Sequence, residues 1–168
     1  MGYIMATQTQ ENSACLKISD LMSVSRILLL KGKQKKDDVL KNLVKAISME
    51  ENSGEEDDLL WGIMHREELM STGIGKNIAT PHTSVNGLET TPCIALGVCP
   101  DGIVDYQSPD MLPVKLVFMI ITPKDNAVNQ LKILAAIGNL FYDGRLKAAC
   151  LACGDPERCL AIIQRAEQ

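Results

Sequence analysis

A short stretch of the chain, Arg66 to His82, combines a guanidinium, hydroxyl groups, closely spaced glycines and an imidazole. The run Ser71-Thr72-Gly73-Ile74-Gly75 supplies hydroxyls and backbone N–H groups, and its glycines let the backbone approach an anion closely. Pro81 fixes its own φ and holds the residue before it extended, so the histidine follows a stiff piece of backbone. This order predicts a phosphate cradle followed by a histidine that carries a phosphoryl group.

The chemistry of such a carrier defines the candidate site. A neutral imidazole, with a pKa of about 6.5, is a nucleophile toward phosphorus near neutral pH. The resulting N–P bond is labile, so the group can be passed on. Positioning and fixed donors are sufficient for this transfer, and we expect no metal and no other cofactor. The predicted site consists of His82 as nucleophile, Arg66 as a bidentate phosphate ligand, and Ser71, Thr72, Gly73 and Gly75 as phosphate-binding residues.

Other interpretations of these residues are weaker. A lone histidine is more often a satisfied structural residue, and His65, which precedes the motif, is expected to lie on a helix surface. A nucleotide-binding loop of the Walker type would need a glycine in place of Met70. A serine hydrolase that uses Ser71 or Ser84 with His82 stays an alternative, although no nucleophile elbow accompanies either serine.

The motif resembles a known family. Arg-Glu, Ser-Thr-Gly-Ile-Gly and Ala-x-Pro-His, in this order and spacing, are similar to the signature of the fructose/mannitol-type (type 2) enzyme IIA domains of bacterial sugar phosphotransferase systems, which include the nitrogen-regulatory IIA proteins. The resemblance extends from about Leu21 to Ala166. It implies a phosphotransferase in which His82 accepts a phosphoryl group from the carrier protein HPr and passes it to a IIB domain for sugar uptake. The alternative is a nitrogen-branch regulatory module whose phosphorylation state controls binding to a target protein.

Two positions depart from the family pattern. Many members carry a second histidine beside the phosphorylated one, in a His-Leu-x-x-Leu context, and the residue at that place here is Gln130. A glutamine amide donates and accepts hydrogen bonds but does not titrate, so we expect the transfer rate or the partner choice to differ. Thr80 stands where an aliphatic residue is usual, which is a smaller departure.

The composition is that of one ordinary globular domain. The chain has 168 residues, of which 46% are hydrophobic and 23% charged. The net charge of −4 argues against nucleic acid as the main partner. No apolar run is long enough to span a bilayer, and the first residues do not read as a secretory signal, so we expect a cytoplasmic protein without direct membrane insertion. Homo-oligomer formation stays open.

Six cysteines are the one unusual feature of the composition. Cys150, Cys153 and Cys159 have a spacing that invites a zinc or redox interpretation. A closed zinc site needs a fourth ligand, and both histidines lie far upstream. We therefore expect buried or partly buried free thiols.

Apolar periodicity predicts strands interleaved with helices, and hence a single three-layer α/β domain with a small mixed sheet flanked by helices. Residues 1–14 are expected to be a flexible N-terminal segment, and residues 15–168 are expected to form an enzyme IIA type 2-like domain. Strands are expected at 27–30, 92–98 and 114–122, with the last central in the sheet, and loops at 83–91 and 100–112. Helices are expected at 37–49, 55–70, 127–142, 146–153 and from Asp155-Pro156 onward. In the helix at 127–142, Leu131 is expected to face inward.

Overall fold

The computed structural model describes residues 16–50, 55–86 and 91–168. Two short 3-10 turns, η1 (Ile18–Leu21) and η2 (Val24–Arg26), precede a sheet of six strands. The strands are β1 (Ile27–Leu29), β2 (Gly73–Gly75), β3 (Ile78–Ala79), β4 (His82–Val85), β5 (Cys93–Ile103) and β6 (Val114–Pro123). The helices are α1 (Lys36–Ser48), α2 (Glu56–Leu69), α3 (Ala127–Leu140), α4 (Arg145–Leu151) and α5 (Pro156–Ala166).

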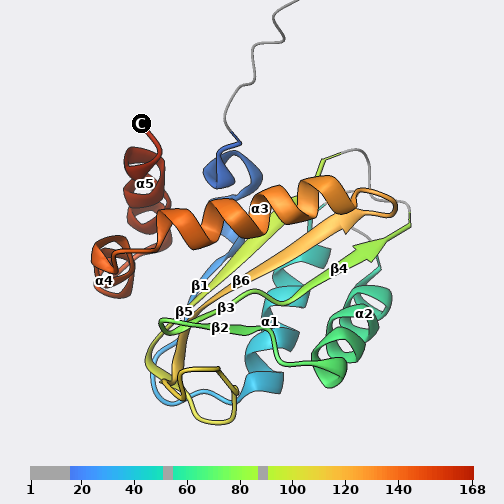
Figure 1. Ribbon diagram of the computed structural model, residues 1–168, viewed down its shortest axis with the longest axis horizontal. Helices are drawn as coiled ribbons and strands as arrows, with labels where there is room; N and C mark the ends of the chain where they lie inside the picture. The colour runs from blue at the N-terminus through green and yellow to red at the C-terminus, as the bar shows by residue number, and fades with distance from the viewer. Residues whose placement is uncertain (1–15, 51–54, 87–90) are drawn as a thin grey trace, which may run out of the picture.

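The sheet is mixed and is built around β6. The strand order is β1-β5-β6-β3-β2, and β4 also pairs with β6, beyond the end of β3 (Figure 1). β5 and β6 run antiparallel, whereas β1 is parallel to β5, and β3 and β4 are parallel to β6. The nearly continuous apolar sequence of β6 is explained by this place, because both of its faces are covered by helices.

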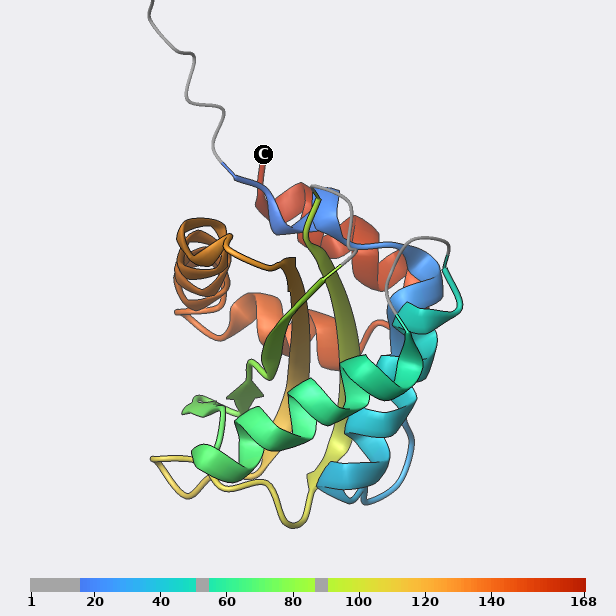
Figure 2. The same ribbon diagram turned by 90° about the vertical axis from the view of Figure 1, so that its right-hand side faces the viewer.

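Helices cover both faces of the sheet, which confirms the predicted three-layer α/β fold. Side chains alternate along β6: Leu116, Phe118 and Ile120 point to one cluster of buried residues, and Val117, Met119 and Ile121 to the other. α1 and α2 pack on the second cluster, and α3, α4 and α5 lie on the opposite side of the sheet (Figure 2).

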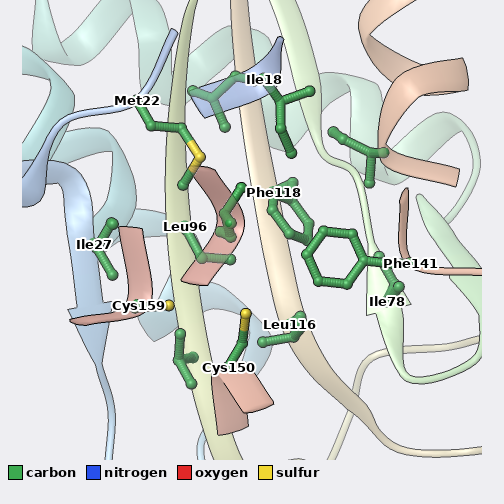
Figure 3. Packing of buried hydrophobic residues seen from close by; sticks show 14 of the residues in the cluster. Ile18, Met22, Ile27, Ile78, Leu96, Leu116, Phe118, Phe141, Cys150 and Cys159 are labelled. Carbon is green, nitrogen blue, oxygen red and sulfur yellow. The ribbon is translucent and has the colours of Figure 1, made fainter. Parts of the chain in front are cut away.

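The first cluster holds the larger side chains of the core. Phe118 from β6 and Phe141 from the end of α3 meet with ring centroids 5.0 Å apart (Figure 3). Cys150 and Cys159 lie at the same interface, and together with Cys153 they are buried free thiols, as expected. Among the described residues, no group of three or more histidines, cysteines or carboxylates is arranged to hold a metal ion. Of the helices described here, none is both long and apolar enough to cross a membrane.

Several boundaries differ from the sequence prediction. The predicted loop at 83–91 begins as strand β4, because its polar residues pair in register with the distant strand β6. β5 continues past the predicted end to Ile103, with a register shift against β6 that accommodates Pro100. Leu131 is 67% exposed, and Ile133 and Ile137 form the buried side of α3 instead. The proposed flexible segment 1–14 lies outside the described residues.

The glycine-rich segment also has a different form from the one expected. β2 and β3 make a hairpin whose turn residues, Lys76 and Asn77, both have positive φ, of 54° and 67°. This is the backbone geometry that two-residue hairpin turns require. Helix α4 contacts this turn, because Lys147 Nζ donates to the Lys76 carbonyl at 2.9 Å.

Candidate functional site

His82 is the first residue of β4, and its imidazole is held in one orientation by the backbone before it. The ring Nδ1 lies 2.8 Å from the carbonyl oxygen of Thr80. A carbonyl only accepts hydrogen bonds, so Nδ1 carries the proton and Nε2 keeps its lone pair. Pro81 is anchored to the centre of the sheet, since its carbonyl accepts the N–H of Ile120 at 2.9 Å. The ring nitrogen of this half-buried histidine that keeps a lone pair is therefore Nε2.

The surroundings of His82 lower its pKa. Partial burial is the largest cause, because it disfavours the charged imidazolium. The hydrogen bond to Thr80 acts in the opposite direction, the charge of Arg66 lowers the pKa further, and the carboxylate of Glu67 raises it. The net result is an imidazole that is neutral at pH 7, as a nucleophile must be.

Arg66 reaches the site from α2, which packs closely on β4. A Cβ at Gly62 would lie 2.4 Å from Thr83 Oγ1, so the glycine permits this contact between helix and strand. Arg66 lies one turn further along the same side of α2. Its Nη1 donates to the carbonyl of Met70 at 3.0 Å, and the side chain is half-buried. The positive charge of Arg66 is thus near enough to His82 to lower the pKa of the imidazole.

The groups predicted to cradle a phosphate are engaged within the protein in this conformation. The Ser71 hydroxyl donates to the carbonyl of Gln107 at 2.7 Å, and the N–H of Gly75 donates to Ser108 Oγ at 3.1 Å. Gly73 permits a close contact between two backbone segments, because a Cβ there would lie 2.2 Å from the Gln107 oxygen. The glycines therefore have a packing role that the sequence alone did not reveal.

Thr72 belongs to a buried polar cluster that sequence reasoning missed. Its hydroxyl donates to Glu67 Oε2 at 2.6 Å and lies 2.7 Å from the hydroxyl of Tyr106. All three residues are buried, and the Thr72 hydroxyl is not available to a phosphate here. A signal for Glu67 existed, because it continues the buried side of α2 formed by Leu59 and Ile63 at intervals of four residues.

Gln130 lies in the first turns of α3 and is half-buried. It precedes the buried Ile133 and Ile137 by three and seven residues, so it is on the side of α3 that faces the sheet. His82 is the register partner of Ile120, whose side chain belongs to the cluster under α3. Gln130 and His82 are therefore on the same face of the sheet.

The residues weighed as alternatives do not join His82. His65 is exposed and stacks on Trp61, with ring centroids 4.9 Å apart, as expected for a helix surface. Ser84 Oγ is 2.8 Å from Thr122 Oγ1, and Ser71 has the partner described above. Within the described residues, the His82 ring has one hydrogen bond, to Thr80, so neither serine is paired with it as a catalytic dyad requires.

An open groove of about 720 Å³ lies next to this site. Lys36, Ser71, Gly73 and Gln107 are among the residues that line it, together with the end of α2. His82 and Arg66 are not among them, so the groove does not enclose the imidazole.

The sequence is similar to a known protein family over most of its length. The family described as "Phosphoenolpyruvate-dependent sugar phosphotransferase system, EIIA 2" matches residues 20–166. The chain is 29% identical over 150 residues to the fructose-specific EIIABC component of the PTS system of Bacillus subtilis (strain 168), in a match that covers 89% of this chain and 23% of that protein. The chain thus spans under a quarter of the length of that relative.

Two solved structures share the fold. The nitrogen regulatory protein IIA-Ntr from Neisseria meningitidis superposes with a TM-score of 0.77 at 22% identity, over 87% of this chain and 98% of that one. Enzyme IIAMTL of Escherichia coli, solved in complex with phosphorylated enzyme IIBMTL, gives a TM-score of 0.68 at 15% identity, over 86% and 99%. At these identities the likeness concerns the fold alone.

Proposed function

Since the chain belongs to the EIIA 2 family of the phosphoenolpyruvate-dependent sugar phosphotransferase system, we propose that it is a phosphocarrier in which His82 accepts and then donates a phosphoryl group. The observation that carries this proposal is the hydrogen bond between His82 Nδ1 and the Thr80 carbonyl. It leaves Nε2 as the nucleophile without the help of a separate base.

The transfer is a displacement at phosphorus. Nε2 of His82 attacks the phosphoryl group of a donor phosphohistidine, the donor's N–P bond breaks and a new N–P bond forms on Nε2. The Nδ1 proton stays on the ring and remains bonded to Thr80. The guanidinium of Arg66 offsets the charge that the phosphoryl group brings, through planar donors suited to phosphate oxygens.

The predicted phosphate ligands other than Arg66 already have hydrogen-bond partners within the protein. Ser71 and Gly75 would bind the phosphoryl oxygens only after exchanging their present partners, Gln107 and Ser108. The N–H of Gly73 donates to Ser71 Oγ at 3.4 Å and would have to leave it in the same way. Thr72 instead belongs to the buried cluster with Glu67 and Tyr106. We therefore assign the principal contact with the phosphoryl group to Arg66, and we assign no metal to the transfer.

The partners that we propose follow from the family. The donor is an HPr-type phosphocarrier protein and the acceptor is a IIB domain, by analogy with the complex of enzyme IIAMTL and phosphorylated enzyme IIBMTL. The alternative, a regulatory module whose phosphorylation state controls binding to a target, is supported by the fold shared with IIA-Ntr and by Gln130. Either role would be carried out by one domain, residues 15–168, in the cytoplasm.

Labelling with a reconstituted donor chain tests the proposal. The wild-type chain, incubated with enzyme I, HPr and phosphoenolpyruvate, should gain one acid-labile phosphoryl group by intact-mass measurement. His82→Gln should gain none, whereas His65→Gln, which alters the other of the two histidines, should be labelled like the wild type. Equal labelling of His82→Gln would remove His82 from its role. Adding candidate IIB domains to the labelled chain then distinguishes a relay from a regulatory module.

A further inference from the structure

Glu67 is a buried carboxylate one residue after Arg66, and it is 5% exposed. Its Oε2 accepts hydrogen bonds from the Thr72 hydroxyl at 2.6 Å and from the Tyr106 hydroxyl at 3.2 Å. The backbone N–H of Thr72 donates to both carboxylate oxygens, at 3.2 and 3.3 Å. A carboxylate that receives three donors in the interior is held in one position.

We propose that Glu67, with Thr72 and Tyr106, is a positioning residue for the phosphoryl-accepting imidazole of His82, acting through the backbone of Thr72 and Thr80. This inference rests on the proposed phosphocarrier function. It assigns a role in phosphoryl transfer to residues that touch neither the phosphoryl group nor the reacting nitrogen.

The hydrogen atoms of the cluster can be accounted for completely. The Thr72 hydroxyl has one hydrogen, and the short contact of 2.6 Å to Glu67 uses it. Burial is the largest cause, and the Glu67 carboxylate a second, of a raised pKa for Tyr106, so its hydroxyl stays protonated. Its one hydrogen is shared between Thr72 Oγ1, 2.7 Å away, and Glu67 Oε2, 3.2 Å away. The cluster thus has one fully satisfied arrangement, which specifies the backbone position of Thr72.

Two consecutive hydrogen bonds connect Thr72 to the imidazole. The Thr72 carbonyl accepts the N–H of Thr80 at 3.0 Å. The Thr80 carbonyl in turn accepts the Nδ1 proton of His82 at 2.8 Å. A shift of Thr72 is therefore transmitted to the one hydrogen bond that fixes the tautomer and the orientation of the ring.

The cluster also joins three segments that are distant in sequence. Glu67 comes from the end of α2, Thr72 from the start of the β2–β3 hairpin, and Tyr106 from the connection between β5 and β6. Ser71 adds a second link between hairpin and connection through Gln107, as described above. Glu67 additionally acts on His82 through space, because its carboxylate raises the pKa that Arg66 lowers.

A purely structural role is the competing explanation. An aliphatic residue at position 67 would continue the buried side of α2, so packing alone does not call for an acid there. If the cluster served stability alone, its variants would change the unfolding temperature and leave the imidazole and its kinetics as they are. The test therefore reads out His82 directly.

The decisive variant is Glu67→Gln, which keeps the shape of the side chain and removes its charge. The matched control is Glu68→Gln, which makes the same change at the exposed neighbour. NMR of the imidazole nitrogens gives the tautomer and the pKa of His82, whose signals are assigned by the loss of the other histidine in His65→Gln. Rates of phosphorylation by HPr are measured on the same samples.

In Glu67→Gln the pKa of His82 should fall below its wild-type value, because a pKa-raising charge is lost, and the ring should populate both neutral tautomers. The phosphorylation rate should drop about tenfold, the scale expected for a small misplacement of a reacting group. Glu68→Gln should match the wild type in all three readouts. Tyr106→Phe, which removes one hydroxyl, should change tautomer and rate in the same direction by less, and it serves if Glu67→Gln fails to fold.

An unchanged tautomer and rate in Glu67→Gln, or in Tyr106→Phe where that variant is the folded one, would overturn the proposal. Failure of the phosphocarrier function itself is distinguishable, because the wild-type chain would then accept no phosphoryl group. The NMR comparison would still decide whether Glu67 positions the ring.

Discussion

At the scale of the residue, the site depends on which ring nitrogen of His82 holds the proton. The Thr80 carbonyl sets the tautomer, and partial burial with the nearby guanidinium of Arg66 keeps the ring neutral. In the proposed transfer Arg66 thus has two separable effects, one through its positive charge on the pKa of His82 and one through its planar donors on the phosphoryl group.

Two substitutions of Arg66 should separate these effects. Arg66→Lys keeps the charge, so the pKa of His82 should stay lowered while phosphoryl transfer slows about tenfold for lack of bidentate contacts. Arg66→Gln removes a charge that lowers the pKa, so the pKa of His82 should rise. As the pH falls, the ring of this variant should become protonated earlier, and phosphorylation should therefore begin to decline at a higher pH than in the wild type. Phosphate-affinity gels over a pH series measure the rate of phosphorylation of both variants and its dependence on pH. Identical pH profiles for Arg66→Gln and wild type would remove Arg66 from the electrostatics of the site.

At the scale of the element, the contact between α2 and β4 brings Arg66 and His82 together. The contact is tight at Gly62, where a Cβ would lie 2.4 Å from Thr83 Oγ1. Gly62→Ala should push the helix away from the strand and destabilise the protein by about 1–3 kcal/mol, with slower phosphorylation. Gly138→Ala in α3 is the matched control, since nothing lies within 4 Å of its Cβ, and it should be neutral or stabilising by up to about 1 kcal/mol.

Thermal unfolding and phosphorylation rates of these two variants test whether the contact between α2 and β4 sets the geometry of the site. Adding Thr83→Ala to Gly62→Ala removes the Oγ1 atom from the clash and should recover part of the loss in both measurements. A Gly62→Ala protein as stable and as active as Gly138→Ala would mean that α2 does not set the geometry of the site.

The elements also show how far the sequence alone can be read. The central strand β6 and most helices are predictable, because apolar periodicity reports burial directly. β4 is not, since His82, Thr83 and Ser84 are polar and pair with a strand distant in sequence. The Lys76-Asn77 turn lacks the glycine that usually marks positive φ, so the sequence of the segment before it predicts a phosphate cradle rather than a hairpin. The role of Glu67 depends on Tyr106, whose place is set by tertiary structure.

At the scale of the whole molecule, the sheet lies between two layers of helices that each carry a predicted site residue. α2 contributes Arg66 from one layer, and Gln130 of α3 belongs to the other, on the face of the sheet that His82 shares with Ile120. A titrating residue at position 130 would carry a positive charge on this face of the sheet at low pH, which the glutamine does not.

Gln130→His should therefore lengthen the lifetime of the phosphohistidine several-fold below about pH 6.5, where the new imidazole is charged. Its effect at pH 8 should be small. Hydrolysis half-lives of the two phosphorylated proteins across that range test this, with Asn129→His as a control at the neighbouring position. If the variant and the wild type have the same pH profile, Gln130 does not reach the phosphorylated ring.

The most direct test of the central claim is the identity of the nitrogen that carries phosphorus. Isotope-edited NMR of the phosphorylated chain, with labelled imidazole nitrogens, resolves coupling of phosphorus to either ring nitrogen of either histidine. The account predicts one N–P bond, on Nε2 of His82, with Nδ1 still protonated and bonded to the Thr80 carbonyl. Phosphorus on Nδ1 of His82, on His65, or on no histidine would contradict it.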